Sequence, residues 1–264
     1  MGKNKLKKFS EMETFDRVFQ YPFALLTDGK CPIKGKWHSD VFKNDNPIVL
    51  ELGCGKGEYT VGMARRFPDK NFIGIDIKGA RMWTGAKEMN RDNITNAAFL
   101  RTDIELLQAF FEPGEVSEIW ITFPDPQMKK ERKRLTSTRF LDLYKKVMTD
   151  SGIVHLKTDS PFLYTYTRLL AEHNNIPTIH LTDNLYGAPA GQFDDILGIK
   201  TFYEQQWLSR GLTIKYIAFP LAHNSELEEP PVEIEPDTYR SFSRGELQCP
   251  DLCSPKVTPK SCKS

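Results

Sequence analysis

The stretch that decides the fold is Glu51-Leu-Gly-Cys-Gly-Lys-Gly57, a glycine-rich turn that directly follows the apolar run Ile48–Leu52. Glycine has no Cβ, so the backbone of such a turn can approach a ligand closely. The helix-like stretch Tyr59–Arg66 comes next. A strand, a glycine turn and a helix in this order indicate the first unit of a ligand-binding α/β domain.

The same alternation of strand and helix signals continues outward from the turn. Five short apolar runs predict buried parallel strands: Ile48–Leu52, Phe72–Ile75, Ala98–Leu100, Glu118–Thr122 and Ile153–Leu156. Thr178–Leu181 and Thr213–Phe219 are two later strand candidates. Five stretches between or after them predict helices: Tyr59–Arg66, Ala80–Arg91, Ile104–Phe111, Thr138–Met148 and Phe202–Ser209. We therefore expect an α/β fold with a doubly wound, seven-stranded, mostly parallel sheet of the Rossmann-like type. The carboxyl ends of its strands lie along one edge.

Composition divides the chain into three zones. Residues 1–44 are polar and mixed and show no strong strand signal, so we expect a partly flexible extension packed on or beside the core. Residues 45–222 carry the alternating pattern and form one domain. Residues 223–264 combine frequent proline with low hydrophobicity, which predicts a disordered tail because too little apolar surface is available for burial.

Charge and cysteine content exclude several classes of protein. The chain has 36 basic and 35 acidic residues, so any basic surface for a polyanion must be a local patch. No run approaches the roughly 18 apolar residues of a membrane span, and no apolar signal core follows the basic start, which favours a cytoplasmic protein. The five cysteines lack a Cys-x-x-Cys pair, so we expect free thiols and no metal site.

The glycine turn itself is compatible with two kinds of ligand. A dinucleotide fingerprint that starts at Gly53 needs a third glycine at position 58, where this chain has Glu58. A carboxylate at the start of the helix repels a pyrophosphate. Glu51 instead suits a positively charged ligand without phosphate, such as the sulfonium of S-adenosylmethionine. The turn alone is weak evidence, because many such turns only join a strand to a helix.

Two further strand ends carry carboxylates that suit the same ligand. Asp76 ends the second predicted strand, where an acidic residue can accept hydrogen bonds from both ribose hydroxyls. Asp103 follows the third strand and could accept from the amino group of an adenine. A carboxylate at either place can also be a simple helix cap, and for Asp103 the two roles are equally compatible with the sequence.

The fourth strand ends in Thr122-Phe-Pro-Asp-Pro126, in which Asp125 is restricted between two prolines. Five of the six residues in Lys129–Arg134 are cationic. Such a run is usually a solvated face, but here it follows the sheet edge at which ligands bind. Its position favours contacts to the phosphates of a nucleic acid.

Two later segments add carboxylates that suit a purine base. Asp159 ends the fifth strand in His155-Leu-Lys-Thr-Asp159, and Glu204 ends the stretch Thr201-Phe-Tyr-Glu204. The Watson–Crick edge of guanine has two donors, N1–H and the amino group, which one carboxylate can accept together. The sequence therefore favours guanine as the base.

With these motifs in place, the chain resembles the bacterial tRNA (guanine-N7-)-methyltransferase family. The resemblance covers roughly residues 47–220 and follows the family's order. It rests on the segments Glu51–Gly57, Gly74–Asp76, Thr102–Asp103, Phe123–Pro126, Lys157–Asp159 and Thr201–Glu204. It implies methylation at N7 of a guanine in the variable loop of tRNA, guanine 46, with S-adenosylmethionine as methyl donor, tRNA as partner and a monomer or homodimer as the assembly.

The resemblance also implies roles for individual residues. Asp125 is implied as the catalytic residue. The residues implied for the methyl donor are Glu51, Gly53, Gly55, Asp76, Asp103 and Asp125. Those implied for the tRNA guanine are Lys129, Asp159, Thr201, Phe202, Tyr203 and Glu204.

One segment departs from the family's pattern. After Asp-Pro the family continues with Trp, a variable residue, Lys and then Arg-His, whereas this chain has Gln127-Met-Lys-Lys-Glu131. Two alternatives stay open on the residues alone: a methyltransferase for another substrate, which leaves the basic run unexplained, and a tRNA-binding protein without catalysis, which leaves the donor carboxylates unexplained.

Overall fold

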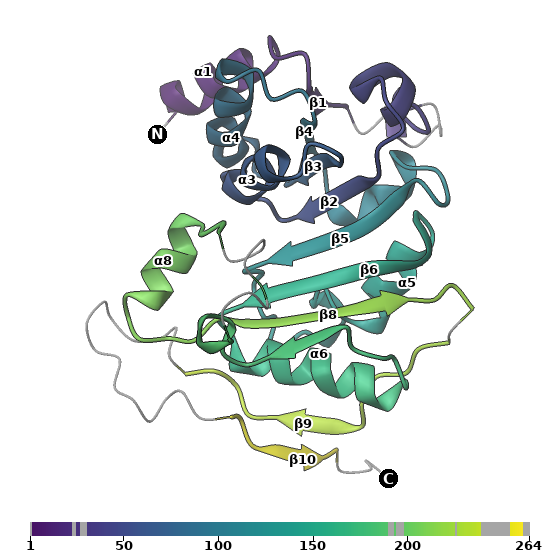
Figure 1. Ribbon diagram of the computed structural model, residues 1–264, viewed down its shortest axis with the longest axis vertical. Helices are drawn as coiled ribbons and strands as arrows, with labels where there is room; N and C mark the ends of the chain where they lie inside the picture. The colour runs from purple at the N-terminus through teal and green to yellow at the C-terminus, as the bar shows by residue number, and fades with distance from the viewer. Residues whose placement is uncertain are drawn as a thin grey trace. The chain divides into compact units, whose positions relative to one another are not determined.

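The structure is a computed structural model that describes residues 2–22, 25–26, 31–189, 193, 198–224, 226–238 and 254–260, with backbone only for residues 2–5. The chain forms two compact units. Unit 1 comprises Met1–Thr122 and Leu143–Gly152, and unit 2 comprises Phe123–Asp142 and Ile153–Ser264. Most helices and strands of both are labelled in Figure 1.

Unit 1 is built on parallel strands in the order β1-β4-β3-β2-β5. Their bounds are β1 Val18–Gln20, β2 Ile48–Leu52, β3 Asn71–Ile75, β4 Ala97–Arg101 and β5 Val116–Thr122. Every residue of β2 and β3 is buried, which explains why their sequences are nearly continuous apolar runs. The order reverses between β2 and β5, and doubly wound sheets bind ligands at such a reversal.

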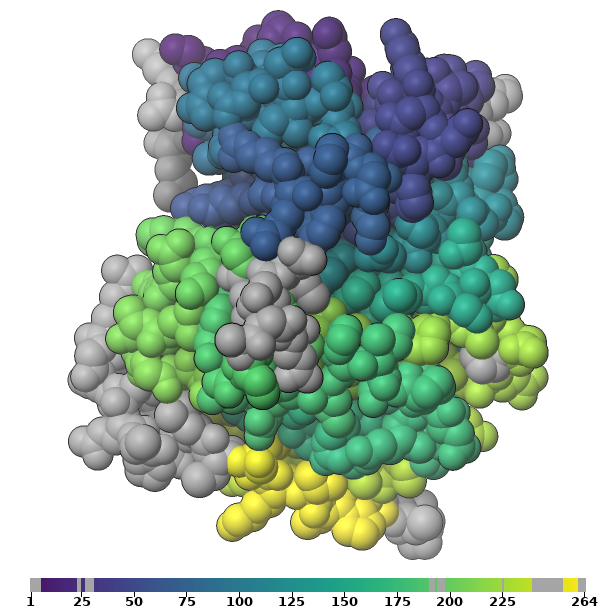
Figure 2. Space-filling view, viewed as in Figure 1, coloured from purple at the N-terminus to yellow at the C-terminus, as the bar shows by residue number. Residues whose placement is uncertain are grey.

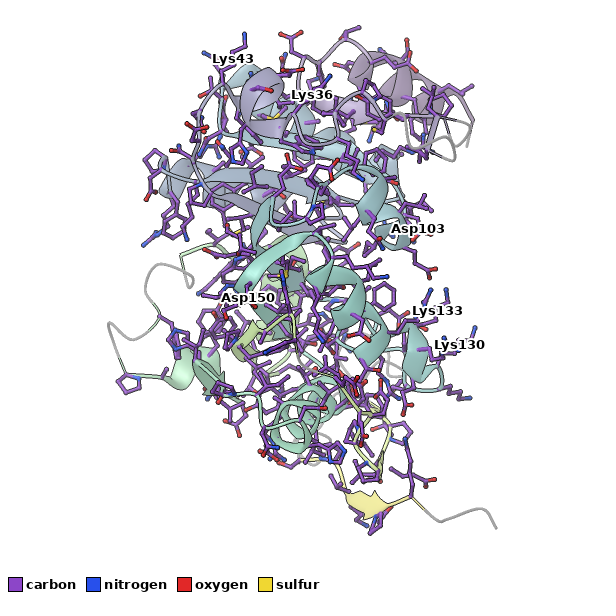
Figure 3. All side chains as sticks on the ribbon, turned by 90° about the vertical axis from the view of Figure 1, so that its right-hand side faces the viewer. Lys36, Lys43, Asp103, Lys130, Lys133 and Asp150 are labelled. Atoms are coloured by element: carbon purple, nitrogen blue, oxygen red, sulfur yellow. The ribbon has the colours of Figure 1, made fainter. Side chains whose placement is uncertain are left out.

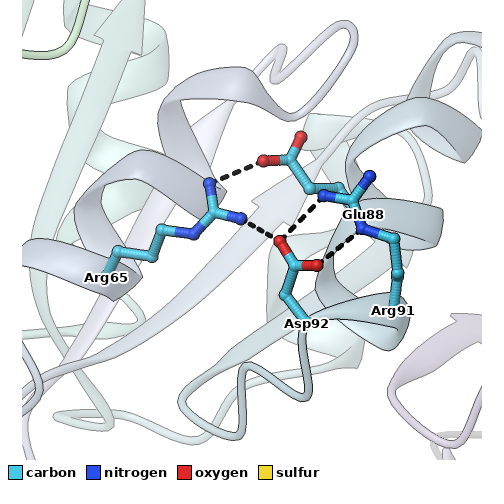
Figure 4. Close-up of polar contacts among 4 residues, drawn as sticks. All are labelled: Arg65, Glu88, Arg91 and Asp92. Carbon is cyan, nitrogen blue, oxygen red and sulfur yellow. Dashed lines mark hydrogen bonds and ion pairs between the residues drawn. The ribbon is translucent and has the colours of Figure 1, made fainter.

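Helices of unit 1 pack on these strands and on one another. They are α1 (Gly2–Met12), α3 (Glu58–Arg66), α4 (Gly79–Arg91), the π-helical η1 (Trp37–Phe42) and the 3₁₀-helical η2 (Ile104–Ala109). Arg65 of α3 pairs with Glu88 at 2.6 Å and with Asp92, which links α3 to the end of α4 (Figure 4). A hydrogen bond from Arg91 is the main reason that the pKa of Asp92 falls to about 2.

The N-terminal extension contains more structure than its sequence predicted. β1 pairs with β4 and adds an eighth strand to the seven expected. Its three residues are too few for an alternating pattern to be recognised. Trp37 is fully buried, and its Nε1–H donates to the carbonyl of Phe110 at 2.9 Å. Helix α1 packs against α4, where the indole N–H of Trp83 donates to Glu11 at 2.8 Å.

Unit 2 contains the strand order β6-β8-β7, with β7 antiparallel to β8. Its elements are the 3₁₀ turns η3 (Glu131–Lys133) and η4 (Leu185–Gly187), the helices α5 (Thr138–Lys145), α6 (Pro161–His173) and α8 (Phe202–Leu208), and the strands β6 (Met148–Thr158), β7 (His180–Thr182) and β8 (Lys215–Leu221). Two of these, α5 and β6, have residues in both units. All seven predicted strands are present, and the predicted mostly parallel α/β fold is confirmed.

Two helix predictions need correction. The sequence predicted no helix over 161–173, where α6 lies; its signals are Ser160, whose side chain accepts from the backbone N–H of Leu163, and Pro161 at the first helical position. The helix predicted over Thr138–Met148 ends at Lys145, and Met148 begins β6.

The predicted disorder of residues 223–264 does not hold for 226–238 and 254–260. Strands β9 (Val232–Ile234) and β10 (Val257–Pro259) pair in antiparallel fashion. Composition does not reveal this order, because the tail carboxylates Glu229 and Asp237 accept hydrogen bonds from residues far away in the chain. The tail cysteines Cys249, Cys253 and Cys262 lie outside the described residues. Within the described ranges, no helix has the length and apolar character needed to cross a membrane.

Candidate functional site

The glycine turn lies at the carboxyl end of β2 and is tied to β3. The N–H groups of Gly53 and Cys54 both donate to the carbonyl of Ile75, at 2.8 and 3.0 Å. Gly53 and Gly55 have positive φ, and a Cβ added to Gly53 would meet no atom within 4 Å. Gly57 differs, because a Cβ there would lie 2.5 Å from the ring of Phe99. The first two glycines thus leave open space beside the backbone, and the third permits close helix–strand packing.

Glu51 lies beneath this turn and is only 2 % exposed. Its Oε2 accepts hydrogen bonds from the backbone N–H of Thr60, at 2.9 Å, and from the hydroxyl of that residue. Its Oε1 accepts from the hydroxyl of Thr122 at 2.7 Å. Burial raises the pKa of Glu51 to about 7, although the hydrogen bonds from the two threonines oppose the rise. Among the described residues, no cationic side chain pairs with this carboxylate.

Asp76 connects the end of β3 to the turn. Its Oδ2 accepts from the N–H of Gly55 at 2.9 Å, and its Oδ1 accepts from the N–H of Lys78 at 2.7 Å. The carboxylate remains partly exposed. The next residue, Ile77, is 58 % exposed, which is unusual for a large apolar side chain. Glu51, Gly53, Gly55 and Asp76 are therefore brought together at the edge where the strand order reverses.

Asp103 follows β4 and caps η2. Its Oδ1 accepts from the N–H of Glu105 at 3.0 Å, which is one of the two roles that the sequence allowed. The side chain is exposed and is labelled in Figure 3. Among the described residues the cap occupies only Oδ1, so the carboxylate retains acceptor capacity.

In unit 2, Asp125 is exposed at the centre of a tight loop. Its Oδ1 accepts from the N–H of Gln127 at 3.0 Å. Phe123 and Gln127 both have positive φ, a conformation that is uncommon outside glycine. The N–H of Phe123 donates to the carbonyl of Lys157 at 2.8 Å, which ties the start of the loop to β6.

The basic run after this loop is not a single cationic face. Lys129, Lys130, Arg132 and Lys133 are exposed, and Lys130 and Lys133 project from the ribbon in Figure 3. Arg134 is buried, with its guanidinium over the rings of Phe162 and Tyr166 at 4.8 and 4.3 Å. The sequence could not show that Arg134 is buried while the other cations of the run are exposed, because its partners lie on the unpredicted helix α6.

The residues predicted to meet guanine differ widely in exposure. Asp159 is 1 % exposed, whereas Phe202 and Tyr203 are 51 % and 42 % exposed. The rings of Phe202 and Tyr203 lie 5.8 Å apart, edge to face. Thr201 and Glu204 form a capping box at the start of α8: the side chain of each accepts from the backbone N–H of the other.

Glu204 is fully buried and forms an ion pair with Lys157, itself fully buried, at 2.7 Å. The hydroxyl of Tyr186 donates to the same carboxylate. Burial lowers the pKa of Lys157, and the charge of Glu204 opposes the change. Lys157 was not predicted as a partner of Glu204; its signal is a lysine within the buried second half of β6. Thr60, Thr122 and Ile77 were overlooked as well.

Among the described residues, no group of three or more His, Cys, Asp or Glu side chains could hold a metal ion. The roles of all the site residues named above remain predictions.

Solved structures with similar folds are methyltransferases. A 30S ribosomal A1408 methyltransferase from an uncultured bacterium has 17 % sequence identity and a TM-score of 0.50, over 69 % of this chain and 90 % of that chain. A protein described as an antibiotic-related methyltransferase has 12 % identity and a TM-score of 0.52, over 79 % of this chain and 98 % of that chain. At these identities the likeness concerns the fold alone, and it agrees with the predicted Rossmann-like α/β fold.

Sequence comparisons are more specific. A family model described as a putative methyltransferase matches residues 45–217. A tRNA (guanine-N(7)-)-methyltransferase of Porphyromonas gingivalis is 65 % identical over 88 % of this chain and 96 % of its own length. Proteins of the same name from Bacteroides fragilis and Listeria monocytogenes are 59 % and 32 % identical, over 92 % and 75 % of this chain and 96 % and 91 % of their own lengths. The chain therefore belongs to the bacterial tRNA (guanine-N7-)-methyltransferase family.

Proposed function

We propose that this protein is an enzyme that transfers the methyl group of S-adenosylmethionine to N7 of a guanine in tRNA, at guanine 46 of the variable loop. Family membership supports the reaction and the class of substrate. The observation that carries the proposal is Glu51, a buried carboxylate without a cationic partner among the described residues, beside a glycine turn that leaves open space.

The residues of unit 1 fit the methyl donor. The open space at Gly53 and Gly55 admits a ligand against the backbone. Asp76 has acceptor capacity for ribose hydroxyls, and the exposed face of Ile77 suits a purine ring. Asp103 is placed after β4 to accept from the adenine amino group. S-adenosylmethionine supplies an electrophilic methyl group on a positively charged sulfur, and the charge of Glu51 favours that cation.

The chemistry needs little from the protein beyond alignment. Guanine N7 is a lone-pair acceptor, so no residue has to remove a proton before attack. Asp125, restricted between Pro124 and Pro126 and held by the N–H of Gln127, is suited to orient the base and to stabilise the positive charge that develops on it. We assign Asp125 the catalytic role on this basis.

The residues of unit 2 suit an RNA substrate. Lys129, Lys130, Arg132 and Lys133 are exposed cations that can contact phosphates. The exposed rings of Phe202 and Tyr203 can stack on unpaired bases. Asp159 is assigned to the Watson–Crick edge of the guanine, and Thr201 and Glu204 hold the helix that presents the two rings.

The test is methyl incorporation into unmodified tRNA from tritiated S-adenosylmethionine, with the methylated base mapped afterwards. Asp125→Ala should lower kcat by at least about a hundredfold and leave the circular dichroism spectrum unchanged. Asp45→Ala, at another exposed aspartate, is the matched control. Full activity of Asp125→Ala would refute its catalytic role, and incorporation into a tRNA that lacks guanine 46 would refute the position. Methylation of protein or metabolites, but not of tRNA, would support the alternative of another substrate.

A further inference from the structure

The described parts of the tail form a strap on unit 2. This C-terminal strap comprises residues 226–238 and 254–260, which include β9 and β10, and it lies outside the residues 45–217 that the family model matches. In Figure 1 β9 lies beside α6 and β10 lies on the far side of β9, and in Figure 2 residues 254–260 form an exposed yellow band.

Two carboxylates anchor the strap at helix starts. Oε1 of Glu229 accepts from the N–H and the hydroxyl of Thr138, at 3.0 and 2.9 Å, and Oε2 accepts from the hydroxyl of Tyr166 at 2.5 Å. Asp237 accepts from the N–H of Phe162 at 2.9 Å and from the hydroxyl of Ser160. A negative side chain at a helix N-terminus is favourable, so these contacts fix the strap to α5 and α6.

The strap also contacts the loop that carries Asp125. The N–H of Asp237 donates to the sulfur of Met128 at 3.1 Å. The carbonyl of Met128 in turn accepts from the guanidinium of Arg134 at 3.0 Å. Since Arg134 stacks on Phe162 and Tyr166, the same two α6 residues that the anchors contact, loop, strap and helix form one connected network.

A second contact of the strap, an ion pair with Glu131, changes the charge of the basic run. Glu131 is the one acidic residue in the run Lys129–Arg134. Nζ of Lys260, in the last described part of the strap, lies 2.9 Å from Oε2 of Glu131. Arg134 lies 3.7 Å from the same oxygen. A carboxylate amid phosphate-binding cations repels RNA, and the closer ammonium of Lys260 adds to the compensation of that charge. Within the described part of the chain, Lys256, at the other end of the same segment, forms no ion pair with Glu131.

We propose that the C-terminal strap completes the RNA-binding surface of this enzyme. Asp237 positions the Asp125 loop through Met128, and Lys260 neutralises Glu131 within the cationic run. The inference rests on the proposed function, since it specifies how the same surface accepts tRNA.

The charge contact is tested by Lys260→Glu against Lys256→Glu, which make the same change in net charge at the two ends of one segment. Lys260→Glu should raise KM for tRNA by about three- to tenfold, more so at low salt, with kcat and the Kd of S-adenosylmethionine unchanged. Lys256→Glu should have a clearly smaller effect. Adding Glu131→Lys to Lys260→Glu should restore KM. The charge role of Lys260 would be overturned if the two single variants raised KM for tRNA equally, or if adding Glu131→Lys did not restore KM.

The positioning contact is tested by Asp237→Ala against Glu235→Ala, another acidic residue of the strap. Asp237→Ala should lower kcat for tRNA by about tenfold while the Kd of S-adenosylmethionine and the melting temperature of the donor-bound protein change little. Asp237→Asn retains an acceptor for Phe162 and should recover most of the rate. An active wild-type enzyme with an unaffected Asp237→Ala variant would overturn the strap inference alone, whereas a wild-type protein inactive on tRNA would refute the proposed function itself.

Discussion

Two buried glutamates, one in each unit, have opposite surroundings. Glu51 of unit 1 is 2 % exposed, and its recorded partners are the neutral hydroxyls of Thr60 and Thr122 and a backbone N–H. Glu204 of unit 2 is fully buried against the ammonium of Lys157 at 2.7 Å and also accepts from Tyr186. The side chains are the same, but their charges are balanced in different ways.

The difference is the basis for the ligand-binding role proposed for Glu51, whereas the charge of Glu204 is compensated within unit 2. A buried charge is costly unless a charge of opposite sign or strong hydrogen bonds compensate it. Lys157 compensates Glu204 inside unit 2, and the pair anchors the capping box of α8. Among the described residues Glu51 has only neutral donors. Burial raises its pKa to about 7, and a bound cation is therefore favourable beside it. Burial alone therefore does not reveal the role of an acidic residue.

The largest expected effect comes from removing the cation of unit 2. Lys157→Met leaves Glu204 buried without its counter-charge and should lower the free energy of unfolding by about 4 kcal/mol. The double variant Lys157→Met/Glu204→Met should lose much less, because neither charge remains. Urea unfolding monitored by circular dichroism measures both. A single variant as stable as the wild type would contradict the comparison.

The second expected effect is a pH dependence of stability caused by Glu51. Its pKa in the folded protein, about 7, exceeds the ordinary value of 4.5, so the folded state holds the proton more tightly than the unfolded state. Stability from this group is therefore fully present below pH 4.5 and is lost as the pH rises to 7. The loss is about 3 kcal/mol, since one pKa unit corresponds to about 1.4 kcal/mol.

Glu51→Gln should lack this pH dependence. Urea unfolding of the wild type and the variant at pH 5 and pH 8 gives the difference directly. Parallel curves for the two proteins would show that Glu51 is ionised throughout, contrary to the effect of its burial.

The third effect concerns the methyl donor. Glu51→Gln should weaken binding of S-adenosylmethionine by about ten- to a hundredfold, the range expected when a charged group is removed from a polar contact. Glu204→Gln should leave donor binding unchanged within a factor of about two. Titration calorimetry at pH 8 distinguishes the two variants. Equal weakening by both would remove the distinction between the ligand-binding and the structural glutamate.

The smallest effect concerns the rings that α8 presents. Phe202→Ala should raise KM for tRNA by about fivefold, because stacking of a base on an aromatic ring contributes about 1 kcal/mol or more. Gln205→Ala, an exposed change on the same helix, is the control. Steady-state kinetics at fixed S-adenosylmethionine provide the measurement, and an unchanged KM for Phe202→Ala would remove that ring from the tRNA surface.

The predictable part of the fold follows from local patterns. Strands such as β2 and β3 were recognisable because strands buried on both faces are short apolar runs with turn residues around them. β1 was missed because it has three residues and depends on β4 for its pairing. The ordered tail was missed because its anchors, Glu229 and Asp237, are polar residues whose partners lie far away in the chain.

The tertiary structure shows what the residues that depart from the family's pattern contact. Met128 and Glu131 belong to the stretch that differs, and both contact the C-terminal strap. No local pattern could connect these residues with Asp237 and Lys260, because the contacts join segments more than a hundred residues apart.

By itself the sequence determined the order of the elements, the glycine turn and the set of carboxylates at strand ends, because these depend on periodicity and on residues adjacent in the chain. Only the tertiary structure decided which of those charged groups face solvent and which are paired inside. Asp103 and Asp125 are exposed, Asp159 is buried, Glu204 pairs with Lys157, and Arg134 stacks on α6. The physical reason is that burial and charge compensation depend on partners brought together by folding, and those partners leave no mark on the local sequence.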